Sequence, residues 1–218
     1  MVAARTAFLD AGYYAPLRAV AAAAAEYTSG DTDVLDAGCG EGYYTAHVLH
    51  ALQAQGRSAS VCGVDISRDA LICAHRRAPE LTLAVASIAH LPVADASCDL
   101  LLNVFAPHDA AEFARVLRTN GVLLRVIPLE RHLWGLKQAV YDHPYENTVP
   151  DPVLPGFTFA EQRTLRGTIT LRTNADIEAL FCMTPYYYKT GARDQAKLHA
   201  RDALTTETEF ALLIYRKA

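Results

Sequence analysis

Two patterns of apolar residues alternate along the first 130 residues of the chain, short continuous runs and residues at helical spacing. Short apolar runs bounded by turn residues predict buried strands at 33–37, 60–65, 81–86, 98–106 and 121–128. Between these runs, apolar residues recur at helical spacing, which predicts helices at 15–27, 43–53, 68–77 and 110–117. Alternating strands and helices are typical of an α/β fold in which helices cover both faces of a parallel sheet.

The pattern changes in the last third of the chain. Prolines at 144, 150, 152 and 155 make residues 142–156 a long irregular connection, and in a compact domain such a connection is often a functional loop. Beyond it the pattern predicts a strand within 157–171, helices near 175–181 and 194–203, and a closing strand at 209–217. Because 218 residues suffice for one ordinary core, we expect one domain with small additions.

Composition narrows the classes of protein to consider. No window approaches the roughly 18 apolar residues of a spanning helix, and the first residues lack the apolar core of a signal peptide, so we expect a cytoplasmic protein without membrane contact. The five cysteines are scattered without a C-x-x-C pair, and the eight histidines form no H-x-x-x-H, so we expect reduced thiols and no metal. A net charge of -4 neither requires nor excludes a nucleic acid partner.

The stretch LDAGCGEGYYT, at 35–45, joins a predicted strand to a predicted helix. Gly38, Gly40 and Gly42 have the spacing G-x-G-x-G, whereas the dinucleotide fingerprint is G-x-G-x-x-G. Asp36 precedes these glycines and Glu41 lies among them. An acidic side chain in the turn would repel a pyrophosphate, but it suits a cofactor that carries a sulfonium and an ammonium group.

Asp65 stands at the end of the second predicted strand, where a carboxylate can accept hydrogen bonds from both ribose hydroxyls of a nucleoside. Together with the glycine turn, this arrangement resembles the class I S-adenosylmethionine-dependent methyltransferases. The alternative is a structural strand-turn-helix with incidental glycines. The resemblance implies a Rossmann-like fold with a mostly parallel seven-stranded sheet and an antiparallel last strand, and S-adenosyl-L-methionine as the cofactor.

Several other segments resemble the 23S rRNA (guanine-N1)-methyltransferase family, which modifies a guanine in a large-subunit hairpin. They cover nearly the whole chain: RTAFLDAGYYAPLR (5–18), GVDIS (63–67), VASIAHLPVADASCD (85–99), FAP (105–107), ERHLWGLK (130–137) and MTPYYYKT (183–190). The resemblance implies an N-terminal helical lead-in over 1–30 and a methyltransferase domain over 31–218.

The family resemblance also assigns cofactor contacts by position. Tyr14 lies in the lead-in, Gly42 and Tyr43 lie at the end of the glycine turn, and His132 lies in ERHL. Alternatively, Tyr14 packs the first helices onto the sheet, and His132 caps or fills the start of a helix. The complete expected cofactor set is Tyr14, Asp36, Gly38, Gly40, Glu41, Gly42, Tyr43, Asp65, Ile66, Ser87 and His132.

The substrate pocket is expected after the fourth predicted strand, where this class of fold presents the target atom to the methyl group. Phe105 is expected to stack on a base or to fill the core, and Asn103 and the carbonyl of Pro107 to hold a purine edge. Methylation of guanine N1 also requires removal of its proton. The sequence offers three candidates for the base without choosing between them: Glu41, His108 and Asp109.

One departure from the family concerns a zinc module. Family members usually begin with a four-ligand zinc module that grips RNA, and the first cysteine of this chain is Cys39, in the glycine turn. We therefore expect this module to be missing, which keeps three functions open: a methyltransferase acting on a 23S rRNA hairpin, a methyltransferase acting on a small molecule, and a non-catalytic cofactor-binding protein or nucleotide-dependent oxidoreductase. A homodimer is expected by analogy with the family.

Overall fold

The structure is a computed structural model that describes residues 2–218 and divides into two compact units. The first, here called the sheet unit, comprises residues 16–127, 150–163 and 211–218. The second, the helical unit, comprises residues 2–15, 128–149 and 164–210. Two long strands near the C-terminus run through both units. The expected division into a lead-in up to residue 30 and a domain from residue 31 stays a prediction.

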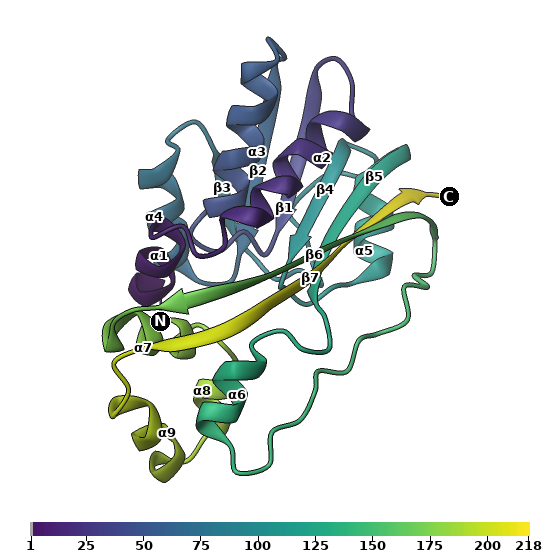
Figure 1. The fold of residues 1–218 in the computed structure, drawn as a ribbon. Helices are drawn as coiled ribbons and strands as arrows, with labels where there is room; N and C mark the ends of the chain where they lie inside the picture. Colours follow the sequence, from purple (N-terminus) through teal and green to yellow (C-terminus); the bar gives the residue numbers. More distant parts are fainter. Residues whose placement is uncertain (1) are drawn as a thin grey trace. The chain divides into compact units, whose positions relative to one another are not determined.

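The sheet unit is built on a seven-stranded sheet (Figure 1) with the order β3-β2-β1-β4-β5-β7-β6. The strands are β1 Thr32–Ala37, β2 Ala59–Asp65, β3 Thr82–Val85, β4 Cys98–Val104, β5 Leu117–Pro128, β6 Phe157–Leu171 and β7 Leu204–Lys217. The first five pair in parallel, and Val34 of β1 faces Val61 on one side and Leu100 on the other. β7 runs opposite to β6 (Figure 1), so the predicted fold class is confirmed.

Helices of the sheet unit pack around this sheet. They are α2 Ala19–Tyr27, preceded by a 3₁₀ turn at Ala15–Arg18, α3 Tyr43–Ala54, α4 Arg68–Arg77 and α5 Ala110–Val116. α3 lies between α2 and α4, and both α3 and α4 contact β2. All four helices lie where the apolar spacing predicts them. Ser67 is the N-cap of α4, because its hydroxyl accepts the main-chain N–H of Ala70 at 3.3 Å.

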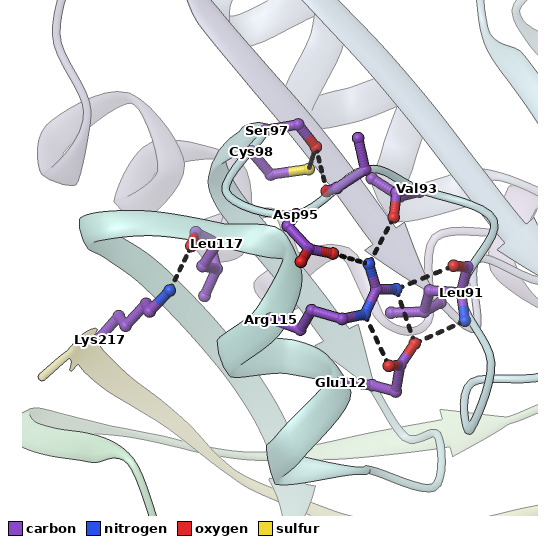
Figure 2. Close-up of polar contacts among 10 residues, drawn as sticks. Leu91, Val93, Asp95, Ser97, Cys98, Glu112, Arg115, Leu117 and Lys217 are labelled. Atoms are coloured by element: carbon purple, nitrogen blue, oxygen red, sulfur yellow. Dashed lines mark hydrogen bonds and ion pairs between the residues drawn. The ribbon is translucent and has the colours of Figure 1, made fainter.

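A charged network fixes the segment that leads from β3 to β4 (Figure 2). Arg115 of α5 forms an ion pair with Glu112 and donates to the carbonyls of Leu91 at 3.0 Å and Val93 at 2.8 Å. The main-chain N–H of Leu91 donates to Glu112 at 2.8 Å. These donors lower the pKa of Glu112 to about 2. The network therefore holds a segment without helix or strand against α5.

β5 departs from its predicted bounds, because it begins at Leu117 instead of residue 121. Thr119, Asn120 and Gly121, turn-forming residues at the start of the predicted strand, lie inside β5. Cys98 of β4 pairs with Leu117, and the next pair is Leu100 with Val122, so the additional residues form a bulge. Asn120 adopts φ 63°, a left-handed conformation that asparagine tolerates better than most residues.

The helical unit contains α1 Val2–Asp10, α6 Trp134–Val140, α7 Asn174–Cys182, α8 Tyr186–Lys189 and α9 Ala192–His199. α1 contacts α7, and α6 and α7 both contact α9. The hydrophobic pattern predicts neither α6 nor α8, which are short and begin without a side-chain cap. α1 lies within the helical lead-in that the family resemblance implies. The helix predicted at 194–203 is placed too late, since α9 spans Ala192–His199. The closing strand predicted at 209–217 is too short, since β7 begins at Leu204.

Candidate active site

The glycine turn lies between β1 and α3 in the sheet unit. Gly38, Gly40 and Gly42 have φ values of 93°, 55° and 76°, a left-handed region that favours glycine. The carbonyl of Val64 in β2 accepts the N–H groups of Gly38 at 2.8 Å and Cys39 at 3.1 Å. A Cβ atom at Gly38 would lie 2.5 Å from the Cβ of Ala106, so the turn also packs closely against the segment after β4.

Asp65 connects this turn to the end of β2. Its Oδ2 accepts the main-chain N–H of Gly40 at 2.9 Å, and its Oδ1 accepts that of Ser67 at 2.8 Å. Each carboxylate oxygen can accept further hydrogen bonds, and the side chain is half-buried. Ile66 follows with 79% of its surface exposed. A fixed carboxylate beside an exposed apolar side chain suits a ribose and an adenine ring.

Negative charge accumulates in the glycine turn. Asp36 and Glu41 are each only 1% exposed, and Asp36 Oδ2 accepts the hydroxyl of Thr45 at 2.6 Å. Burial raises the pKa of the Cys39 thiol, and the nearby carboxylates of Asp36, Asp65 and Glu41 raise it further. The same field that disfavours a thiolate stabilises a cation. The turn therefore fits the sulfonium and ammonium groups of S-adenosyl-L-methionine better than a pyrophosphate.

Tyr43 and Ser87 complete the expected cofactor set in the sheet unit. Tyr43 begins α3 as a buried residue, and the guanidinium of Arg77 lies 5.4 Å from its ring centroid. Ser87 is exposed in the segment after β3, where its hydroxyl accepts the N–H of Ala89 at 3.2 Å. The cofactor contacts of these residues stay predictions.

At the end of β4, the buried side chain of Asn103 holds several segments together. Its Nδ2 donates to the carbonyl of Ala37 at 3.2 Å and to that of Pro107 at 2.8 Å. Its Oδ1 accepts Nε of Arg125 at 3.4 Å. Phe105 adopts φ 54°, an unusual conformation for a bulky residue, and such conformations concentrate at functional sites. The structure thus joins Asn103 to Pro107, and their contact with a purine stays a prediction.

Two of the three candidate bases follow Pro107. Arg125 donates from Nη2 to Nδ1 of His108 at 3.1 Å, and because a guanidinium cannot accept, the neutral imidazole carries its hydrogen on Nε2. Burial and the charge of Arg125 lower the pKa of His108, so the ring is neutral at pH 7. Asp109 caps α5, where its Oδ1 accepts the N–H of Glu112 at 3.0 Å. His108 is therefore arranged as a donor, and Asp109 is a carboxylate at the start of a helix.

Tyr14 and His132 lie in the helical unit and contact each other, with 3.2 Å between the Tyr14 hydroxyl and His132 Nε2. The main-chain N–H of Glu209 donates to His132 Nδ1 at 3.3 Å, which places the hydrogen of the neutral ring on Nε2. Burial and the charge of Lys137 lower the pKa of His132 to about 3. His132 lies two positions before α6, near the helix start that the alternative interpretation expects.

Sequence analysis missed two buried cations. Arg125 interrupts the apolar run of β5, and Lys137 lies in the segment ERHLWGLK. A charge within an apolar stretch was the available signal in each case.

Within residues 2–218, no group of three or more His, Cys, Asp or Glu side chains could hold a metal ion. In the same residues, no helix combines the length and the apolar character that crossing a membrane requires.

Fold and glycine turn together define a class I S-adenosylmethionine-dependent methyltransferase. Residues 34–121 match a family described as "Methyltransferase domain". A Micromonospora griseorubida protein is 36% identical over 95% of this chain, covering 74% of its own length. Its provisional designation is 23S rRNA (guanine-N(1)-)-methyltransferase. The Streptomyces fradiae 23S rRNA (guanine(748)-N(1))-methyltransferase is 37% identical over 80% of this chain and 64% of its own length. The chain belongs to the 23S rRNA (guanine-N1)-methyltransferase family.

Solved structures agree with the fold. A Bacillus halodurans protein described as a methyltransferase aligns with a TM-score of 0.54 and 17% identity, over 87% of this chain and 94% of its own. The [4+2]-cyclase SpnF aligns with the same TM-score and identity, over 92% of this chain and 81% of its own. Because one fold supports both kinds of protein, the fold alone does not select the reaction.

Proposed function

We propose that this enzyme transfers the methyl group of S-adenosyl-L-methionine to N1 of a guanine in 23S rRNA. The observation that carries the proposal is the match of 95% and 80% of the chain to two relatives named for this reaction. The negatively charged glycine turn supports the cofactor. The neutral His108 and the adjacent Asp109 support methylation of a guanine whose N1 must lose a proton.

Transfer forms a bond between guanine N1 and the methyl carbon and breaks the carbon–sulfur bond, while the N1 proton leaves to a base. S-adenosyl-L-methionine supplies the electrophilic methyl group and leaves as a neutral thioether. We assign the base to Asp109 and a hydrogen bond to the guanine carbonyl to Nε2–H of His108, because Arg125 occupies Nδ1 of that ring. A positioned base contributes about 10²–10⁴-fold to such a step.

Phe105 and Asn103 complete the proposed substrate pocket. The ring of Phe105 stacks on the guanine, and Asn103 positions this residue and Pro107 by holding the segment after β4 to β1. A guanine in a hairpin leaves its stack at a cost of a few kcal/mol, which stacking on an aromatic ring offsets. The cofactor contacts of Ile66, Ser87, Tyr14 and His132 are inferred from the family.

The proposal is tested by tritium transfer from labelled S-adenosyl-L-methionine. Unmodified 23S rRNA should accept the label at guanine N1, and rRNA already methylated at that position should not. Label in a metabolite extract and not in rRNA would establish the small-molecule alternative. Cofactor binding without transfer to either would establish a non-catalytic protein, and NADH binding would support an oxidoreductase.

Two further expectations follow from the family. RNA binding through phosphate contacts should weaken steeply with salt, and filter binding from 50 to 200 mM salt measures the slope. A homodimer is proposed by family analogy, and light scattering of the purified protein would show twice the 23.7 kDa chain mass. Cytoplasmic location stays a prediction.

A further inference from the structure

Five tyrosines of the helical unit come from two segments that the sequence singles out. Tyr141 and Tyr145 lie at the start of the proline-rich connection, and Tyr186, Tyr187 and Tyr188 belong to the MTPYYYKT motif and α8. The ring of Tyr141 lies 5.9 Å from that of Tyr145 and 6.5 Å from that of Tyr186. Tyr141, Tyr145 and Tyr186, which lie up to 45 positions apart in the sequence, therefore form one aromatic cluster.

Lys137 of α6 organises the inner side of this cluster. Its Nζ is buried and donates to the carbonyl of Tyr145 at 2.8 Å and to Asn147 Oδ1 at 2.7 Å. The same atom lies 4.5 Å from the ring centroid of Tyr145 and 5.2 Å from that of Tyr186. These contacts fix the Tyr145 ring, yet 54% of this residue is exposed. Tyr145 thus combines a held ring with an accessible surface.

The rings of α8 are also held while they face solvent. Tyr187 packs edge-on against Phe181, with 5.7 Å between ring centroids, and against Tyr188 at 5.3 Å. Tyr188 is 69% exposed and Tyr187 is 37% exposed. Rings that are already ordered lose little conformational entropy when a ligand binds.

The surface chemistry selects one kind of partner. Among the described residues of the helical unit, the large hydrophobic side chains that are exposed are Tyr145, Tyr187 and Tyr188, and none is aliphatic. Two exposed cations follow Tyr188 in the sequence, Lys189 of α8 directly and Arg193 of α9 five positions later. Flat rings beside cations match unpaired nucleotides, because each base offers a π-face and each phosphate a negative charge.

We propose that Tyr145, Tyr187 and Tyr188, with Lys189 and Arg193, form a platform on which unpaired nucleotides of the RNA substrate stack. This inference rests on the proposed function, since it names the part of the rRNA that the helical unit holds: the single-stranded nucleotides of the hairpin loop. Because bases of any type can stack on these rings, the platform would supply affinity without sequence preference. The methyl-transfer pocket would select the guanine.

The experiment measures fluorescence anisotropy of two labelled RNAs of equal length, a hairpin with an unpaired loop and a fully paired duplex. Tyr188→Ala should weaken hairpin binding about tenfold to a hundredfold, the usual effect of losing one stacked base, and leave duplex binding unchanged. Tyr188→Phe keeps the ring and should bind as the wild type does. Phe159→Ala removes an aromatic residue of the sheet unit that is 42% exposed, and serves as the matched control.

The same variants separate the platform from a structural role. Tyr188→Ala should raise KM for rRNA and leave the melting temperature and the affinity for S-adenosyl-L-methionine unchanged. Tyr145→Ala provides a second variant, and its hairpin binding should also fall. Unchanged hairpin binding in both alanine variants, or an equal loss for the duplex, would overturn the platform.

Failure of the platform and failure of the proposed function give different results. A wild-type enzyme that methylates 23S rRNA, with a Tyr188→Ala variant of equal KM, contradicts the platform alone. A wild-type protein that binds S-adenosyl-L-methionine, prefers the hairpin in a tyrosine-dependent manner and methylates no rRNA contradicts the proposed reaction alone. No hairpin binding by the wild type contradicts the platform whatever the reaction.

Discussion

The main-chain N–H of Gly40 donates to Oδ2 of Asp65 at 2.9 Å, so the glycine turn itself holds the carboxylate at the end of β2. The main-chain N–H of Ser67 donates to the other oxygen, Oδ1, at 2.8 Å. The carboxylate therefore has a fixed direction before any ligand arrives. Fixed acceptors bind ribose hydroxyls with less entropy loss than mobile ones.

Asp65→Ala should weaken binding of S-adenosyl-L-methionine about tenfold to a hundredfold, because hydrogen bonds to a charged group contribute about 1.5–3 kcal/mol. Titration calorimetry measures this affinity. Asp69→Ala removes an exposed carboxylate from the first turn of α4 and serves as the control, with affinity near that of the wild type. Equal affinity in both variants would remove Asp65 from the cofactor site.

Asn103→Ala should lower the free energy of unfolding by about 1–3 kcal/mol, because the buried carbonyl of Ala37 and the partly buried carbonyl of Pro107 lose their donor. Urea denaturation measures the change. Asn174→Ala is the matched control, since its amide also donates to two carbonyls but in a partly exposed position. A loss no larger than that of the control would show that Asn103 does not hold the segment after β4.

Phe105→Ala should depress methyl transfer by the equivalent of about 1–3 kcal/mol of base stacking, with unchanged affinity for the cofactor. If Phe105 instead fills the core, the variant should lose about 3–5 kcal/mol of stability, as expected for Phe113→Ala, which truncates a fully buried ring. Transfer assays, cofactor titration and thermal melting of the two variants distinguish these outcomes. A normal transfer rate in the folded fraction would exclude stacking by Phe105.

Protonation of His132 should lower the free energy of unfolding in acid. Its pKa is about 3 in the folded chain and 6.5 in the unfolded chain, so the unfolded state takes up the proton first as the pH falls. The contribution of neutral His132 to the free energy of unfolding is complete above pH 6.5 and declines as the pH falls toward 3. The loss between pH 7 and pH 5 amounts to about 2 kcal/mol.

Urea denaturation of the wild type and of His132→Gln at pH 7 and pH 5 measures this term. Glutamine does not titrate in this range, so the variant should lose less stability over the same interval. An identical pH dependence in both proteins would mean that His132 is not the group that takes up the proton.

Sequence patterns predicted the elements of the sheet unit well, because each depends on local order. The apolar runs around Val34, Val64 and Leu101 are buried strands, and the left-handed glycines lie between β1 and α3 where the spacing predicts them. The helices that the hydrophobic pattern missed, α6 and α8, lack such local signals. Their position follows from packing between distant residues, which periodicity within one segment does not reveal.

By itself, the sequence determined the class of fold, the acidic glycine turn and the carboxylate of Asp65, because spacing along the chain specifies a strand, a turn and a helix N-terminus. Tertiary structure decided which partner each polar group meets. Arg125 fixes the hydrogen of His108 on Nε2, and Lys137 joins two segments of tyrosines, over separations that no local pattern encodes. Such pairings depend on the register of packed elements, since a buried charge needs a partner that only the folded chain supplies.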